Sequence, residues 1–278
     1  MSPLVAALLQ SLSLGKKTTL ANDETGESST VTRLAHVYEI ARNALEYRAD
    51  HLVRRASIER ILRRQLLFDL SPARIAIELL QELRWARYIT DETFTSGQLE
   101  TILQKYLPLM SSSLDRNWLI GILSAEIEES LNPNSDYKQF TTFAFHVLER
   151  YLSTPADLEL YMAIDKGYSQ SDDARVAYHL FQLLSTQVNE NALLATWQHF
   201  QSAIKSPVLN RLGIFVRQHS GPLVLLRDIY FAYPNDFAVI VEDPEKFKAA
   251  AQKVLQEQLK TTGKRISTAA FRSISHVF

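Results

Sequence analysis

The sequence contains no cysteine. This absence excludes disulfide bonds, thiolate zinc sites, iron–sulfur clusters and cysteine nucleophiles, and it suits a reducing compartment. Long apolar runs are missing too. Beyond the first fifteen residues, the longest runs without a charged residue, such as 176–189 and 191–204, are about 14 residues long, short of the roughly 20 that span a bilayer. We therefore expect a cytoplasmic chain that does not itself cross a membrane.

Glycine is scarce, with eight in the chain, and no two have the spacing of a dinucleotide-binding fingerprint or a nucleophile elbow. The segment GKKT at 15–18 is similar to the end of a phosphate-binding P-loop. That loop needs a glycine five residues earlier, where this chain has Gln10. Backbone-cradled phosphate sites are disfavoured, and we predict no cofactor.

Helical metal motifs are also missing. The seven histidines are scattered, no glutamate is followed three residues later by histidine, and there is no HExxH. Glu126, Glu128 and Glu129 could supply paired carboxylates, but an acidic helix face is usually solvated, and we interpret this one so. We predict no metal ligand and no catalytic residue.

The net charge of −1 hides a division along the chain. Residues 1–90 hold 13 basic and 10 acidic side chains, residues 91–200 hold 6 and 15, and residues 201–278 hold 11 and 6. A nucleic-acid binder usually has a basic excess over its whole domain, so nucleic acid is an unlikely partner. We expect the acidic middle to face the two basic ends within one fold.

The sequence does contain residues that mark the starts of helices. Four prolines follow a good N-cap residue, which is where a fixed φ and a missing N–H help a helix to begin. These pairs are Ser71-Pro72, Thr154-Pro155, Ser206-Pro207 and Asp243-Pro244. The only strand candidate is FAVIVED at 237–243, and one strand is not a sheet. The predicted class is all-α: a multi-helix bundle or irregular αα-hairpin array of about twelve helices, with no substantial sheet.

Composition along the chain predicts three parts. Residues 1–30 form a short apolar segment and a flexible polar tether, residues 31–262 a helical domain, and residues 263–278 a basic amphipathic segment. The helical domain could consist of two subdomains that meet near 132–154. Leu4, Leu8 and Leu12 give the first segment one apolar face, typical of a docking peptide. The alternative is that it packs on its own domain or stays disordered.

A helical wheel predicts one long helix over residues 31–56, because the apolar positions lie on one narrow stripe. Near Ser57 the stripe rotates by about 120°. Either the helix bends there, or one helix packs against two partners.

The end of this helix overlaps a strongly basic stretch, LVRRASIERILRRQLL at 52–67, which carries five arginines and one glutamate. Arg54 and Arg63 each follow an acid by four residues, Asp50 and Glu59, the favourable order for surface pairs. Arg55 lies toward the apolar stripe, where it could either extend along the apolar surface with its charge in water or pair with an acid elsewhere in the fold. The remaining arginines, Arg60 and Arg64, have no acid three or four residues away along the helix and are candidate interaction residues.

The C-terminal segment carries three further candidate interaction residues, Lys264, Arg265 and Arg272, beside the apolar face of Ile266, Ala270, Ile274 and Val277. One hypothesis is that this segment touches anionic lipid or a partner. The other is that the chain is the cytosolic N-terminal portion of a longer integral membrane protein that continues past Phe278.

The sequence thus favours a non-enzymatic helical interaction or scaffold module that acts through its surfaces. If the C-terminal segment touches anionic lipid, this module lies near a membrane. Its partner would be an unidentified protein or an anionic membrane surface. The rival hypothesis is an all-helical enzyme whose site is assembled from dispersed side chains, such as His146, His179, His199 and the glutamates near 126.

Overall fold

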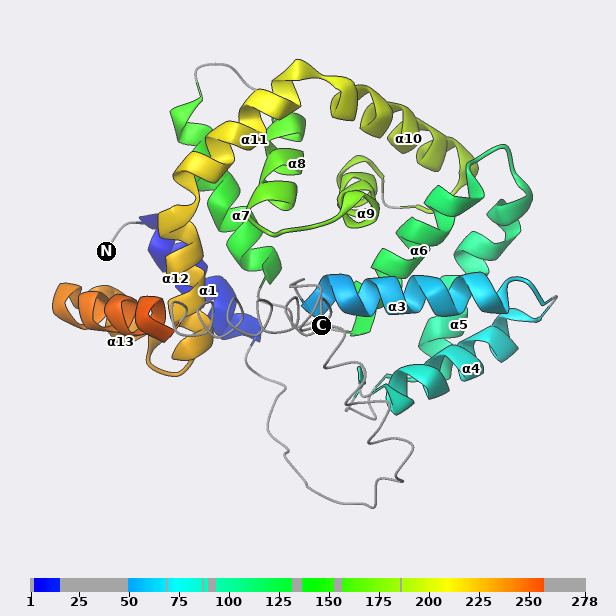
Figure 1. Cartoon of the computed structure of the whole chain (residues 1–278), viewed down its shortest axis with the longest axis horizontal. Coiled ribbons are helices and arrows are strands. Elements are labelled where there is room, and N and C mark those ends of the chain that lie inside the picture. The colour runs from blue at the N-terminus through cyan, green and yellow to red at the C-terminus, as the bar shows by residue number, and fades with distance from the viewer. Residues whose placement is uncertain are drawn as a thin grey trace, which may run out of the picture. The chain divides into compact units, whose positions relative to one another are not determined.

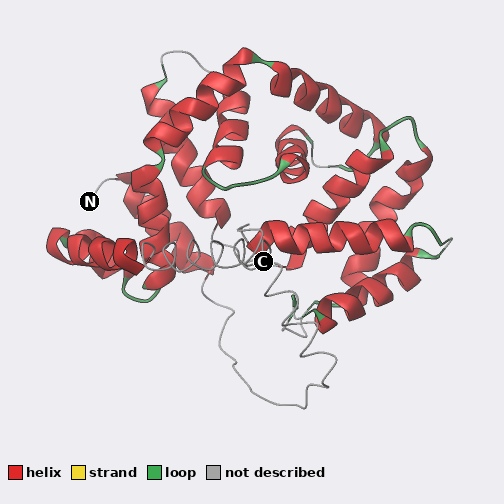
Figure 2. Ribbon diagram, viewed as in Figure 1, coloured by secondary structure: helices red, strands yellow, loops and turns green. Residues whose placement is uncertain are grey.

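The computed structural model describes residues 3–15, 50–68, 70–86, 88–89, 94–131, 137–152, 157–185 and 187–257. These ranges contain thirteen α-helices, two short 3-10 helices and no strand (Figure 2), which confirms the predicted all-α class. The strand candidate at 237–243 is instead a short helix, α13 (Phe237–Glu242).

The chain folds into two compact units, each assembled from separate stretches of sequence. Unit 1 comprises Met1–Thr18, Asp136–Pro155 and Ile214–Phe278, and unit 2 comprises Thr19–Ser135 and Ala156–Gly213. The predicted division at residues 30 and 262 stays a prediction, as does the meeting of two subdomains near 132–154.

Unit 2 is a set of helices packed around α6 (Arg116–Leu131) (Figure 1). On α6 pack α3 (Asp50–Gln65), α5 (Ser96–Tyr106) and α9 (Asp173–Leu184). In turn α4 (Pro72–Trp85) packs on α3 and α5, while α8 (Asp157–Gly167) and α10 (Glu190–Lys205) pack on α9. The turn η2 (Leu107–Ser111) follows α5. Because helices surround α6, its ten consecutive residues from 119 to 128 are all buried.

Unit 1 contains α1 (Pro3–Gly15), α7 (Tyr137–Leu148), η3 (Glu149–Tyr151), α12 (Gly221–Ala232), α13 and a helix over 244–257. The boundary between the units falls within α11 (Pro207–His219). The core of unit 1 contains Phe140, Tyr230 and Phe237, whose ring centroids lie 5.1 to 6.5 Å apart. Leu8 and Leu12 of α1 are 3% exposed and α1 packs on α7, so the N-terminal segment packs on its own fold.

Three of the four predicted helix starts are confirmed, because α4 begins at Pro72, α11 at Pro207 and the last described helix at Pro244. The Ser71 hydroxyl accepts from the backbone N–H of Arg74, and Thr95 and Gln98 form a reciprocal capping box at α5. Asp172 caps α9 by accepting from the N–H of Arg175. The predicted start at Thr154-Pro155 lies outside the described residues.

The long helix predicted over 31–56 lies mostly outside the described residues, which begin again at Asp50. From there α3 continues through Ser57 to Gln65. Since α3 packs on both α6 and α4, the rotated stripe is that of one helix with two partners. Ser57 is buried, and its hydroxyl lies 3.2 Å from that of Tyr88.

Candidate functional site

The glutamates that the sequence analysis interpreted as a solvated face are the start of a buried ionic cluster, so that interpretation is wrong. Glu128 is 3% exposed and accepts from Arg54 of α3 at 3.1 Å and from Arg175 of α9 at 2.8 Å. Glu126 accepts from Lys105 at 3.0 Å and from the Tyr106 hydroxyl. The α6 face is therefore buried against basic side chains from three neighbouring helices.

A histidine held by two carboxylates lies beside Glu126 and Glu128. His179 Nδ1 is 2.7 Å from Asp165 of α8, and its Nε2 is 3.1 Å from Glu129 of α6. The second oxygen of Asp165 accepts from the Ser171 hydroxyl at 2.6 Å. Asp165 is only 1% exposed, whereas His179 and Glu129 are partly exposed, so this arrangement links α6, α8 and α9 through one fully buried and two partly buried charges.

Arg55 extends the same network toward the start of α9. Its guanidinium contacts Asp172 at 2.5 Å, Glu59 at 2.6 Å and the Ser124 hydroxyl at 3.1 Å. The expectation that Arg55 pairs with an acid elsewhere in the fold is confirmed, as is the Glu59–Arg63 pair at 2.6 Å. Arg54 reaches Glu128 on α6, while the side chain of its predicted partner Asp50 lies outside the described part.

Burial and neighbouring charges shift the pKa values of two histidines, His179 and His51, in opposite directions. Burial alone would lower the pKa of His179, but the Asp165 carboxylate and the hydrogen bonds to Asp165 and Glu129 raise it to about 9. Burial, together with Arg175 and Arg54, lowers the pKa of His51 to about 3. At neutral pH, His179 is therefore an imidazolium ion and His51 is neutral.

The backbone is unusual where it joins α8 to α9. Gln170 has φ of 56°, a left-handed conformation that costs energy in a residue other than glycine. The N–H of Ser171 donates to the carbonyl of Asp165 at 2.9 Å and thus fixes this turn. The strained turn places the Ser171 hydroxyl on the Asp165 carboxylate.

This cluster contains only some of the side chains that the enzyme hypothesis requires. Of the three histidines named for it, His179 joins the glutamates, His199 lies exposed on α10, and His146 belongs to unit 1. Both ring nitrogens of His179 are engaged by carboxylates, so neither has a lone pair to offer to a metal or a substrate proton. Among the described residues no group of three or more His, Asp or Glu side chains could hold a metal ion.

A second candidate site lies at the turn between α3 and α4. Leu67 and Phe68 follow the last residue of α3 and are 78% and 59% exposed. Arg116 donates to the carbonyl of Leu66 at 3.1 Å, and Arg63 donates to Asn117 at the start of α6. We call Leu67 and Phe68, with Arg63, Arg64 and Arg116, the hairpin tip.

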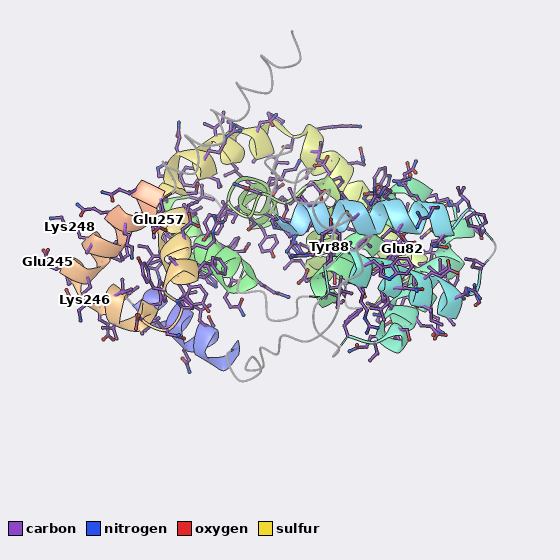
Figure 3. The ribbon with its side chains drawn as sticks, turned by 60° about the horizontal axis from the view of Figure 1, so that its bottom comes forward. Glu82, Tyr88, Glu245, Lys246, Lys248 and Glu257 are labelled. Carbon is purple, nitrogen blue, oxygen red and sulfur yellow. The ribbon has the colours of Figure 1, made fainter. Side chains whose placement is uncertain are left out.

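The predicted interaction residues can be placed in part. Arg64 lies at the hairpin tip with its side chain 55% exposed, and it forms an ion pair with Glu82 of α4. Figure 3 labels Glu82 and Tyr88, both beside α3. Arg60 is exposed one turn before Arg64. Lys264, Arg265 and Arg272 lie outside the described residues.

Asp165, Leu67 and Phe68 are functional candidates that the sequence alone did not indicate. Asp165 follows the apolar run Tyr161–Ile164 on α8, and a lone acid at an inward-facing position is the signal that could have found it. Leu67 and Phe68 continue the apolar pattern of α3 beyond its last residue, and both side chains remain exposed in the described part of the chain.

Comparison with known proteins finds no matching family model, no similar curated protein and no similar solved structure. Among the described helices, none combines the length and the apolar character that crossing a bilayer requires.

Proposed function

We propose that this protein is a helical interaction module that binds an anionic membrane surface through the hairpin tip. The observation that carries the proposal is the pair of adjacent, strongly exposed apolar side chains, Leu67 and Phe68, beside several arginines. Apolar side chains that enter the lipid boundary, with cations at the level of the headgroups, are the pattern of peripheral membrane binding.

The small size of the tip favours a bilayer over a folded protein partner. A stable protein interface buries about 800 Å² on each side, with a broad apolar centre. Two consecutive side chains at the end of a helix do not form such a surface. They do form a point that can insert into lipid without a shaped partner.

The ionic cluster supports the proposal by holding the hairpin in place. Arg54 and Arg55 anchor α3 to α6 and α9 through Glu128 and Asp172, and Arg63 and Arg116 join the tip to the start of α6. Because α3 is fixed at several points along its length, the tip is presented on a rigid support. The buried charges serve this architecture in our proposal, and no chemistry is assigned to them.

The test is co-sedimentation with vesicles of phosphatidylcholine, with and without phosphatidylserine. We expect the protein to sediment with the anionic vesicles and the Leu67→Ser, Phe68→Ser double variant to stay in solution. The matched control is Leu183→Ser, Leu184→Ser, which changes another adjacent pair of exposed apolar side chains, 53% and 43% exposed, at the end of α9. The control should sediment like the unchanged protein.

The charge component is tested separately by Arg60→Gln with Arg64→Gln. Each arginine near an anionic surface contributes about 1 kcal/mol, so the double variant should bind at least tenfold more weakly at low salt. No sedimentation of the unchanged protein with anionic vesicles, or equal loss in the tip and control variants, would refute the proposal.

A further inference from the structure

The helix pair α1 and α7 of unit 1 encloses a groove with a volume of about 380 Å³. Its walls are Ala7, Leu8 and Ser11 of α1 and Lys138, Gln139, Thr142, Phe143 and His146 of α7. Leu8 and Phe143 are 3% and 8% exposed and form the apolar floor. The exposed side chains of Lys138, Thr142 and His146 are spaced by four residues and run along the rim.

We infer that this groove binds a single-chain anionic amphiphile, such as a medium-chain fatty acid, with its carboxylate at Lys138. This site is independent of the hairpin tip, which belongs to unit 2. The groove would hold a free, water-soluble ligand, whereas the tip requires a lipid surface.

The size and lining of the groove select the class of ligand. Its volume lies near the lower end of the roughly 300 to 1,000 Å³ typical of small-molecule sites, so it fits one chain and not a helix of a partner protein. From Lys138 to His146 the rim extends about 12 Å along α7, an elongated shape that suits an extended acyl chain. Burying that chain on Leu8 and Phe143 supplies the hydrophobic gain.

The charges at the two ends of the groove set the orientation of the bound amphiphile. Lys138 is exposed and has no ion pair within the described part of the chain, so its ammonium group can meet a carboxylate. At the other end, His146 Nδ1 lies 3.9 Å from Glu149, whose negative charge disfavours a second anion. The carboxylate is therefore placed at Lys138 and the tail toward His146.

The experiment is calorimetric titration of the full chain with decanoate below its micelle concentration and without vesicles. We expect saturable binding by the unchanged protein and none by Thr142→Trp, which fills the groove from an exposed position. Lys138→Gln should weaken binding about fivefold, because an exposed ion pair contributes up to about 1 kcal/mol. The matched control is Lys248→Gln, an exposed lysine on the helix over 244–257, labelled in Figure 3.

The outcomes separate this inference from the proposed function. The inference that the groove binds an amphiphile is overturned if no saturable binding is seen, or if Thr142→Trp binds decanoate as well as the unchanged protein. This holds whatever the result of the vesicle co-sedimentation. Equal weakening by Lys138→Gln and Lys248→Gln overturns the placement of the carboxylate. A Lys138→Gln chain that unfolds like the unchanged protein but binds decanoate more weakly supports the inference, because this change removes no packing.

Discussion

Two histidines in one buried cluster have pKa values displaced to opposite sides of their ordinary value of 6.5. His179 is held charged between Asp165 and Glu129, and its pKa is about 9. His51 is held neutral by burial near Arg175 and Arg54, and its pKa is about 3. A displaced pKa makes the free energy of unfolding depend on pH, with a sign that follows from the direction of the shift.

For His179 the folded pKa is above the unfolded one, so its stabilisation is complete below pH 6.5 and is lost as the pH rises through 9. For His51 the folded pKa is below the unfolded one, so stability is lost as the pH falls from 6.5 toward 3. The pKa of Asp165 is lowered by His179, Ser171 and Arg175 against the effect of burial, so its contribution is also lost in acid. We predict that the free energy of unfolding is greatest near pH 6.5.

The measurement is urea unfolding at a series of pH values. His179→Gln should flatten the alkaline decline, which we expect to be about 3 kcal/mol at most for a shift of this size. His51→Gln should flatten the acid decline and leave the alkaline one. If His179→Gln left the loss of stability between pH 6.5 and 9 unchanged, the doubly held imidazolium would not be its source.

At the scale of helices, the ionic cluster requires α6 and α9 to approach closely. The contact is made at Gly121 of α6, where an added Cβ would lie 3.1 Å from the Cβ of Ala174 on α9. A glycine inside a helix costs about 1 kcal/mol relative to alanine, so this residue serves the contact and not the helix. Close approach here allows Arg175 and His179 of α9 to reach Glu128 and Glu129 of α6.

We predict that Gly121→Leu lowers the free energy of unfolding by about 1 to 3 kcal/mol, because the larger side chain separates the two helices. Gly121→Ala is expected to be nearly neutral, since the gain in helix propensity offsets the tight contact. Both values come from chemical denaturation. The matched control is Gly213→Ala on α11, where nothing lies within 4 Å of an added Cβ. Stability of Gly121→Leu equal to that of the unchanged protein would contradict the close approach.

At the scale of the whole molecule, the chain leaves unit 2 and returns to it, so each unit is assembled from distant stretches. Each has its own buried core, with Leu8, Leu12 and Phe140 in unit 1 and Leu79, Leu99 and Leu119 in unit 2. The three tryptophans, Trp85, Trp118 and Trp197, all belong to unit 2. Tryptophan fluorescence therefore follows unit 2 alone, whereas far-ultraviolet circular dichroism follows all helices.

We predict that Leu8→Ala destabilises unit 1 by about 2 kcal/mol or more, because Leu8 is 3% exposed. The transition seen by circular dichroism should gain an earlier component while the tryptophan transition stays in place. Leu79→Ala, at a fully buried position of α4 in unit 2, should do the reverse and shift the tryptophan signal. Equal shifts of both signals in Leu8→Ala would mean that the molecule unfolds as one cooperative unit.

Much of the helical architecture follows from the sequence by itself, because its causes are local. Ser71, Thr95 and Asp172 cap helices within three residues of their own positions, so their roles can be predicted from spacing. The Glu59–Arg63 pair is equally local. The all-α class follows from such signals, together with the scarcity of strand patterns.

The partners of the buried charges were decided only by the tertiary structure. Arg54 and Glu128 are 74 residues apart, and Glu129 and His179 are 50 residues apart. An acid on a helix has the same local pattern whether water or another helix covers it, and only packing distinguishes the two. For the same reason, the sequence indicates that Arg64 is basic and on an outer face, while the approach of α4 gives it Glu82 as a partner and leaves Leu67 and Phe68 uncovered.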